Sequence, residues 1–381
     1  MKKVVLPDYR NSLINLTSSI KKHFNPDIKC KYPSIDVLDK VLEGKKKVVL
    51  ILLDGMGINI INNNLDDDSF LKTHIFHQMT SIFLSTTVAA TNTVIQGSLP
   101  GENGWFGWHQ YFQELDKNVI MFFDKDYYTE EAIDSSIKNK YVKMHEYGND
   151  LNVLYHTLYP AFKENGFKNF LDMADKIINI INDTKPSFTY AYWEYPDGLI
   201  HEYGCYNDII KANLLNLSNE LKRIEDNMAN GAICLVIADH GLIDVSPIDL
   251  SFYPNITSYL VKKPSLEGRA TIFYTNHDEG FSKEFNHEFG KWFMLLTKDE
   301  FLASGLLGKD NKMVLPFVGD YIAIAKDKYY FEYSKMKKHN EIIKAHHAGL
   351  TEEEMMIPII LIGGKKWLLQ SVESLAVADV S

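Results

Sequence analysis

The chain has 381 residues, and 45% of them are hydrophobic, enough to bury one large α/β domain or two to three smaller ones. Its 40 Lys and Arg residues against 50 Asp and Glu residues give a formal net charge of −10, which disfavours binding to a nucleic acid polymer. Three cysteines are too few for a disulfide framework, and no apolar stretch approaches the roughly 20 residues of a membrane span. We therefore expect a soluble, cytoplasmic protein without a membrane partner.

Short apolar runs that end abruptly in polar residues recur along the chain. The clearest run, Val48–Leu53, leads directly into Asp54 and Gly55. A continuous apolar run without alternation is typical of a parallel strand that is buried on both faces. Comparable runs occupy residues 119–123, 188–193, 233–238 and 356–362. Helical patterns lie between them, the best with apolar residues at spacings of 3 and 4 from Leu214 to Met228. This alternation predicts an α/β fold, a doubly wound and mostly parallel sheet with helices on both faces.

Residues 246–345 have a different pattern. Two short strand candidates, Thr271–Tyr274 and Tyr321–Ala325, are separated by polar stretches that contain Gly, Asn, Lys and Asp. We interpret 246–345 as a smaller α+β cap that is inserted into one main domain, formed by residues 1–245 together with 346–381.

Carboxylates and imidazoles follow several of the predicted strands. In open α/β sheets, ligands bind at the carboxyl ends of the strands, so these side chains are expected to meet at one edge. They are Asp54, Asp197, His201, Asp239, His240 and the pair His346 and His347. Taken singly, each has an ordinary explanation, such as a helix N-cap for Asp54 or a turn residue for Asp197. Four segments that deliver Asp and His to one edge predict instead a site for zinc or a similar divalent ion.

A run of small hydroxyl residues precedes an expected helix that stops at Gly97. Ser85, Thr86 or Thr87 lies near the helix N-terminus. Such a residue is either a plain N-cap or a hydroxyl nucleophile, held where backbone N–H groups and the helix dipole favour an anion.

Five motifs in order resemble a known family. They are LILLDGMG, STTVAATNTVIQGSLPGENGWFGW, YPDGLIHEYG, IADHG and HHAGLTEEEMMIP, and they span residues 48 to about 362. In this order they resemble the alkaline phosphatase superfamily, in its branch of type I phosphodiesterases and nucleotide pyrophosphatases. The resemblance implies that the main domain is an alkaline-phosphatase-like catalytic domain, and we expect the cap to shape specificity for the leaving group.

The resemblance also implies a dinuclear site. Its first metal would be bound by Asp54, Asp239 and His240, with the nucleophile's oxygen beside them. Its second would be bound by Asp197, His201 and His347, with His346 as the alternative to His347. The nucleophile would be Thr87, which stands ten residues before Gly97, with Thr86 as the alternative. We expect two Zn²⁺ ions, with Mn²⁺ as the alternative.

The implied reaction is the hydrolysis of a phosphodiester or phosphoanhydride through a phosphothreonine intermediate. The substrate would be a small phosphorylated molecule, with a nucleotide as one candidate. The nucleotide pyrophosphatases of the family carry an Asn three residues after the nucleophile, where this chain has Ala90. The alternatives are a phosphomonoesterase, a phosphonate hydrolase, and a protein that binds a phosphorylated ligand through metals without turnover. The sequence leaves the natural substrate and the oligomeric state open.

Overall fold

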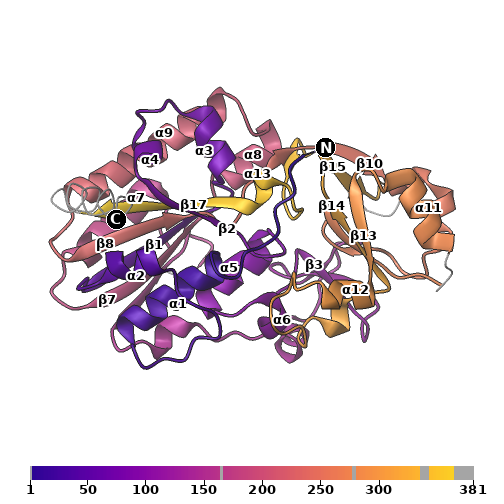
Figure 1. Cartoon of the computed structure of the whole chain (residues 1–381), viewed down its shortest axis with the longest axis horizontal. Coiled ribbons are helices and arrows are strands. Elements are labelled where there is room, and N and C mark those ends of the chain that lie inside the picture. The colour runs from indigo at the N-terminus through magenta and orange to yellow at the C-terminus, as the bar shows by residue number, and fades with distance from the viewer. Residues whose placement is uncertain (1, 164–165, 277–279, 335–342, 364–381) are drawn as a thin grey trace, which may run out of the picture.

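The computed structural model describes residues 2–163, 166–276, 280–334 and 343–363, which form two lobes (Figure 1). The main lobe is built on a six-stranded sheet with the order β2-β17-β8-β1-β7-β6. Its strands are β1 (Lys47–Leu53), β2 (Ile75–Thr80), β6 (Leu154–Leu158), β7 (Ser187–Trp193), β8 (Ala232–Ile237) and β17 (Met356–Gly363). β17 runs antiparallel to β2 and β8, its two neighbours, and the other neighbouring strands of this sheet pair in parallel. The predicted doubly wound, mostly parallel sheet is confirmed.

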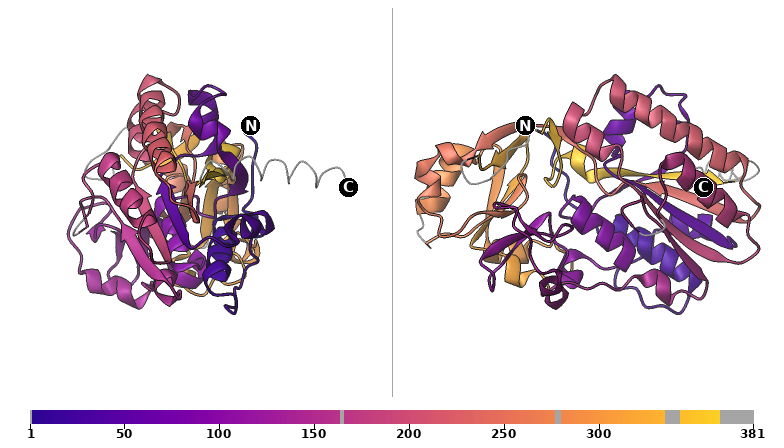
Figure 2. Two further views of the ribbon diagram at one scale, coloured as in Figure 1. Left: turned by 90° about the vertical axis from the view of Figure 1, so that its left-hand side faces the viewer. Right: turned by 180° about the vertical axis from the view of Figure 1, so that it is seen from behind.

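The centre of this sheet follows directly from apolar sequence. Every residue of β1 is buried, and β1 lies between β8 and β7 with parallel register on both sides. Helices cover both faces, with α3, α4, α7 and α9 on one and α1, α2 and α5 on the other (Figures 1 and 2). Their bounds are α1 (Leu13–Phe24), α2 (Asp36–Leu42), α3 (Ile58–Asn64), α4 (Phe70–Thr73), α5 (Thr87–Gln96), α7 (Phe170–Ile181) and α9 (Asp208–Asp226). Apolar residues are therefore required on both sides of β1.

The second lobe is built on a seven-stranded sheet with the order β13-β14-β12-β11-β3-β4-β5, in which all pairings are antiparallel. The strands are β3 (His109–Phe112), β4 (Lys117–Ile120), β5 (Lys125–Asp126), β11 (Ser265–Leu266), β12 (Ala270–Phe273), β13 (Phe293–Thr297) and β14 (Tyr321–Ala325). Both strands predicted within 246–345 lie here, as β12 and β14. The sheet also contains β3, β4 and β5, which come from much earlier in the chain.

One predicted strand is wrong. The run at residues 119–123 was expected to be a buried parallel strand of the main sheet, yet β4 ends at Ile120 and pairs antiparallel in the second sheet. Phe122 and Phe123 lie beyond its end, 41% and 60% exposed. Two exposed aromatic residues of a surface turn therefore extend the apolar run and make it look like a buried strand in the sequence.

The remaining elements are further helices and two small sheets. The helices are α6 (Pro100–Asn103), α8 (Asp197–Tyr203), α10 (Pro254–Thr257), α11 (Gly280–Phe289), α12 (Lys298–Ala303) and α13 (Glu352–Met355). The short 3-10 helices are Ser135–Lys140, Tyr147–Asp150, Leu250–Phe252 and Leu315–Phe317. The two small sheets pair β9 (Ile243–Asp244) with β16 (Ala345–His346), and β10 (Ser246–Asp249) with β15 (Tyr329–Glu332). The division of the chain at 246 and 346 stays a proposal, and residues 335–342 and 364–381 of those two units lie outside the described residues.

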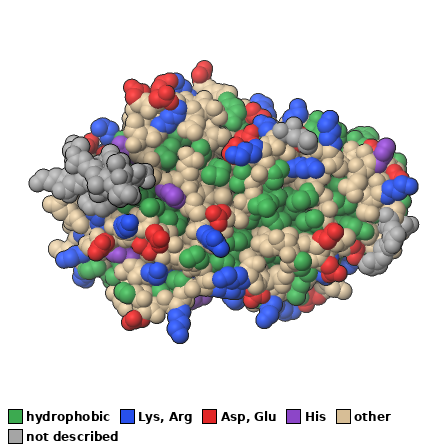
Figure 3. All heavy atoms as spheres, viewed as in Figure 1, with side chains coloured by type: hydrophobic (Ala, Val, Ile, Leu, Met, Phe, Trp, Pro, Cys, Tyr) green, Lys and Arg blue, Asp and Glu red, His purple; other side chains and the backbone are tan. Residues whose placement is uncertain are grey.

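Two further properties concern membrane-spanning helices and the distribution of charge on the surface. Within the described residues, no helix has the length and apolar character needed to cross a membrane. On the face drawn in Figure 3, basic and acidic side chains are interspersed and form no continuous basic stripe, while hydrophobic side chains gather over the second lobe.

Candidate metal centre

The carboxyl ends of the parallel strands face the second lobe (Figure 1), and the first cluster of candidate ligands lies there. Asp54 follows β1 directly, while Asp239 and His240 follow β8. One ligand atom from each of the three lies within 4.8 Å of the others. The Nε2 atom of His240 is 3.5 Å from Asp54 Oδ1 and 3.5 Å from Asp239 Oδ2. All three side chains are buried.

A glycine lets the second cluster approach the first. Gly55 has a φ of +71°, a left-handed conformation that favours glycine. A Cβ atom at Gly55 would lie 2.6 Å from Leu242 Cδ1 and 2.9 Å from Asp197 Cβ. The turn after β1 can therefore pack directly against the start of α8, and the backbone N–H of Asp197 donates to the carbonyl oxygen of Asp54 at 3.0 Å.

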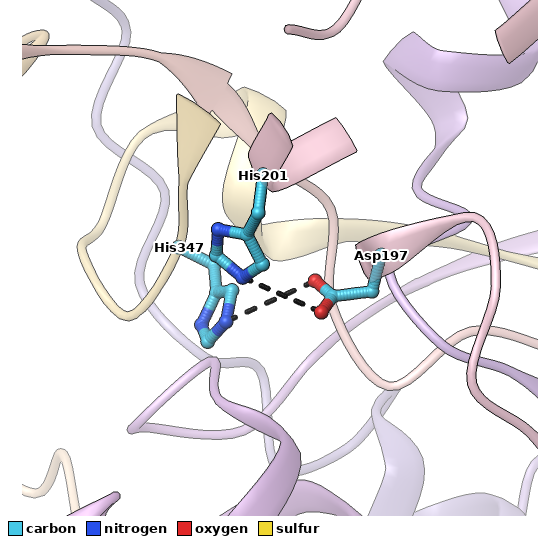
Figure 4. Close-up of side chains that lie close together, drawn as sticks. All are labelled: Asp197, His201 and His347. Atoms are coloured by element: carbon cyan, nitrogen blue, oxygen red, sulfur yellow. Dashed lines mark ion pairs between the residues drawn. The ribbon is translucent and has the colours of Figure 1, made fainter. Parts of the chain in front are cut away.

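The second cluster consists of Asp197, His201 and His347 (Figure 4). Asp197 and His201 are four residues apart on α8, which puts them on one face of the helix. Asp197 Oδ2 is 3.3 Å from His201 Nε2, and its Oδ1 is 3.9 Å from His347 Nε2. His201 Nδ1 contacts the carbonyl oxygen of Ala345 at 2.7 Å, which leaves its Nε2 directed at the cluster. The rings of His240 and His347 stack with centroids 3.9 Å apart, so the two clusters adjoin.

The adjacent histidines His346 and His347 differ in position. His347 is buried within the second cluster. His346 accepts the backbone N–H of His347 through its Nδ1 atom at 2.9 Å, and its ring lies edge-on to Tyr330. Of the two, the structure therefore brings His347 into the candidate ligand set.

The two adjacent threonines also differ in position. Thr87 is the first residue of α5, and its Oγ1 is 3.3 Å from Asp54 Oδ1 and 3.2 Å from His240 Nε2. The hydroxyl of Thr86 instead donates to Glu267 Oε1 at 2.8 Å. Thr87 is therefore the hydroxyl beside the first cluster, at the positive end of the α5 dipole.

The first cluster places two buried carboxyl groups close together, and their ionised forms repel each other. Burial, followed by the carboxylates of Asp239 and Asp197, raises the pKa of Asp54 well above its usual range. Burial is also the main reason that the pKa of Asp239 is raised. The hydroxyl of Tyr192 donates to Asp54 Oδ2 at 2.6 Å, but this one neutral donor does not outweigh the effect of burial on the pKa of Asp54. A cation at this position would offset the repulsion between the carboxylates.

In the second cluster the opposite charges of the carboxylate and the imidazoles come closer to offsetting each other. Burial pushes the pKa of Asp197 upward, but His201 and His240 outweigh it and the pKa is lowered. For His201, burial is outweighed by the Asp197 carboxylate and the pKa is raised. Burial and then the neighbouring imidazoles His240 and His201 hold the pKa of His347 well below its usual range, so that His347 is neutral and can ligate a metal.

Unpartnered oxygens show that both clusters fit a divalent ion. Asp239 Oδ2 and Asp197 Oδ1 are buried and accept no hydrogen bond from the described part of the chain. Each instead lies 3.5 to 3.9 Å from an imidazole nitrogen. Ligands about 2.0–2.2 Å from a shared tetrahedral zinc stand about 3.3 Å apart, so only small adjustments would be needed. The donor set of Asp and His suits zinc, and also manganese.

Three residues near the site were not expected from the sequence. Tyr192 reaches Asp54 from inside β7, where the sequence shows only an apolar run. Glu267 and Arg269 come from the turn between β11 and β12 and are buried against the main lobe. Charged residues in a polar stretch before a predicted strand are usually exposed, so nothing local in the sequence could have identified Glu267 and Arg269.

Comparison with known families gives a match over most of the chain. The sequence model described as "Type I phosphodiesterase / nucleotide pyrophosphatase" matches residues 48–349. No protein of curated function matches the chain in sequence.

Solved structures with the same fold are distant in sequence. Murine ectonucleotide pyrophosphatase/phosphodiesterase 5, in an inactive form in complex with AMP, has a TM-score of 0.59 and 16% identity, covering 83% of this chain and 88% of its own. The human counterpart has a TM-score of 0.56 and 14% identity, covering 83% and 88%. Phosphonoacetate hydrolase from Sinorhizobium meliloti, in complex with phosphonoformate, has a TM-score of 0.61 and 13% identity, covering 84% and 91%.

Proposed function

The chain belongs to the type I phosphodiesterase / nucleotide pyrophosphatase family, and we propose that it hydrolyses a phosphodiester or phosphoanhydride with the help of two divalent ions. The observation that carries this proposal is the meeting of two adjoining Asp/His clusters with a hydroxyl at a helix N-terminus. This combination serves phosphoryl transfer, because two cations and a helix dipole favour the charge that develops on phosphate.

In this proposal one ion is bound by Asp54, Asp239 and His240, and the other by Asp197, His201 and His347. We propose zinc in both, with Mn²⁺ as the alternative. Two such ions would neutralise the phosphoryl oxygens and lower the pKa of the threonine hydroxyl and of a water molecule. They would also offset the net charge of −10 at the point where an anionic substrate binds.

The chain's own contribution is the nucleophile and its orientation. Thr87 Oγ1 attacks phosphorus as its proton passes to solvent, and a Thr87–phosphorus bond forms while the bond to the leaving oxygen breaks. The leaving oxygen departs with its substituent and takes up a proton from solvent where it is not stable as an anion. Water then cleaves the Thr87–phosphorus bond, which restores the hydroxyl and releases the phosphoryl group. The first turn of α5 directs its free backbone N–H groups toward the same region, where they can donate to an anion.

A phosphonate hydrolase is the second candidate, because the fold is shared with phosphonoacetate hydrolase at a TM-score of 0.61. The fold does not separate it from a diesterase or a phosphomonoesterase, since specificity depends on groups around the site. A nucleotide remains one candidate substrate, as murine ectonucleotide pyrophosphatase/phosphodiesterase 5 was solved with AMP. We also retain the proposals of a cytoplasmic location and of a cap at 246–345 that shapes leaving-group specificity.

The test is turnover of bis-p-nitrophenyl phosphate, p-nitrophenyl phosphate and phosphonoacetate, with zinc or manganese added to metal-depleted protein. Preference for the diester supports the first proposal, whereas preference for phosphonoacetate or the monoester supports an alternative. Elemental analysis should find close to two ions per chain. A fully active metal-free preparation would refute the mechanism, and metal binding without any turnover would identify a non-catalytic binding protein. Thr87→Ala is the matched control for background hydrolysis.

A further inference from the structure

A three-residue turn of the second lobe reaches two parts of the proposed site: the segment that carries Thr87 and the loop that follows His347. Glu267, Gly268 and Arg269 connect β11 to β12. Glu267 is 5% exposed, and its Oε1 accepts the Thr86 hydroxyl and the backbone N–H of Trp108, both at 2.8 Å. A single buried oxygen that accepts from both donors fixes the hydroxyl of Thr86 relative to the backbone of Trp108, because neither donor has water as an alternative partner.

Arg269 makes the second contact. It is fully buried, and its Nε and Nη2 donate to Glu354 Oε1 at 2.6 Å and Oε2 at 2.7 Å. Its Nη1 donates to the carbonyl oxygens of Asp327 at 2.9 Å and Tyr329 at 2.8 Å. This bidentate pair joins the second lobe to α13 of the main lobe, and its planar geometry fixes the direction of Glu354.

Glu354 in turn holds the loop that follows His347. Its Oε1 accepts the N–H of Gly349 at 2.7 Å, and its Oε2 accepts the N–H of Thr351 at 3.1 Å. Between His347 and Gly349, Ala348 has a φ of +88°, a left-handed conformation that a residue with a Cβ atom keeps only when its surroundings impose it. The loop would therefore not keep this conformation by local preference alone.

The loop is also tied to the nucleophile segment. Ser85, two residues before Thr87, donates from Oγ to the carbonyl oxygen of Gly349 at 2.9 Å. A Cβ atom at Gly349 would lie 2.9 Å from Arg269 Nη2, so the guanidinium packs directly on the loop backbone. By contrast, Asp54 and Asp239 of the first cluster follow central strands of the main sheet.

We infer that Glu267 and Arg269 are positioning residues, which set the nucleophile and the second metal site from the second lobe. Glu267 holds Thr86, so that Thr87 faces the first cluster. Arg269, through Glu354, holds the loop that keeps His347 in the second cluster. This inference rests on the proposed function, and it gives the second lobe a role in assembling the site beyond the recognition of a leaving group.

Arg269→Lys tests the metal-positioning role without removing the charge that faces Glu354. The two zinc affinities are measured by chelator competition, with His347→Ala as the reference that identifies the second site. We expect the second site to weaken about tenfold or more, as for other groups that orient a ligand, and the first to change less than about threefold. Arg223→Lys, in a partly exposed pair with Glu220 and Asp175 outside the site, is the matched control.

Unchanged zinc affinities alongside a lower melting temperature would overturn the inference for Arg269 and leave it a structural residue. If Arg269→Lys does not fold, Ser85→Ala removes only the donor to Gly349 and should weaken the same site selectively. An unchanged second site in Ser85→Ala would then overturn the inference. Wild-type protein that binds no zinc would instead refute the proposed function, so the two failures are distinguishable.

Glu267 is tested by two substitutions that differ in one property. Glu267→Gln keeps an acceptor oxygen for Thr86 and Trp108, so kcat should stay within about fivefold of wild type. Glu267→Ala removes the acceptor and should lower kcat more than about tenfold, with both zinc affinities unchanged. Equal losses in both variants would show that charge, not positioning, is what matters. Glu114→Ala, at an exposed pair with Lys140, is the control.

Discussion

Replacing Asp54 by Asn should stabilise the metal-free protein while removing metal binding at the first site. The ligand oxygens of Asp54 and Asp239 lie within 4.8 Å of one another. Above the folded pKa of Asp54, where both carboxyl groups are ionised, two like charges at that separation repel by about 3 kcal/mol at an effective dielectric constant of about 20. Asn keeps one of the two acceptor oxygens, so the lost hydrogen bond costs about 1 kcal/mol. The net gain is about 2 kcal/mol. For a chain of 381 residues the unfolding entropy is about 0.8 kcal/mol/K, so the melting temperature should rise by 2 to 3 °C.

The sign of the pH dependence follows from the raised pKa of Asp54, which burial and the neighbouring carboxylates cause. In the unfolded chain this carboxyl loses its proton near pH 4, whereas the folded protein retains it to higher pH. Between these pKa values the folded state binds more protons, so wild-type stability falls as the pH rises. The advantage of Asp54→Asn should therefore be small near pH 4 and complete above the folded pKa.

Calorimetric melting of both proteins, in chelator at pH 4.5 and pH 8 and with saturating zinc at pH 8, checks this prediction. Zinc should reverse the order, because binding stabilises only the protein that retains the ligand. Asp66→Asn, at an exposed carboxylate 78% accessible, should change stability by less than about 0.5 kcal/mol. A lower melting temperature for Asp54→Asn than for wild type in chelator at pH 8 would refute the electrostatic reasoning.

Three further predictions concern single residues. Thr87→Ala should abolish turnover in a p-nitrophenyl diester assay while elemental analysis still finds both metals. Thr87→Ser should retain partial activity. An active Thr87→Ala variant together with an inactive Thr86→Ala variant would instead identify Thr86 as the nucleophile. His347→Ala should deplete one metal and lower kcat by about 10²-fold or more, and His346→Ala should cost much less; equal, mild losses would make the pair structural. Burial raises the pKa of Glu267 to about 7, so wild type loses stability as the pH rises from 4.5 to 7, whereas Glu267→Gln does not. The free energy of unfolding of Glu267→Gln relative to wild type should therefore rise by about 3 kcal/mol over this range, measured by urea unfolding with chelator present. Parallel stability curves for the two proteins would contradict this prediction.

The main sheet was predictable from the sequence because its central strands are buried on both faces. The apolar runs of β1 and β8 therefore report their place in the fold directly. The run at 119–123 is equally apolar, but it lies partly in a surface turn of the second lobe. Some of its side chains are exposed there, although the sequence gives no sign of it. Likewise, β3, β4 and β5 join strands that stand some 150 residues later in the chain. Their pairing is long-range, and a local pattern carries no trace of it.

The candidate ligands that the sequence grouped lie together, since parallel strands bring their carboxyl ends to one edge; their role as ligands stays a prediction. What the sequence left open was a choice between neighbours. Thr86 and Thr87 have the same side chain and stand side by side at the start of α5, so composition and capping rules treat them alike. The difference arises from Glu267, which accepts the hydroxyl of Thr86 and leaves that of Thr87 beside His240. The register of the proposed nucleophile is thus set from the second lobe, by a residue 181 positions away from Thr86 in the chain. A substitution in that turn could change catalysis without touching any metal ligand.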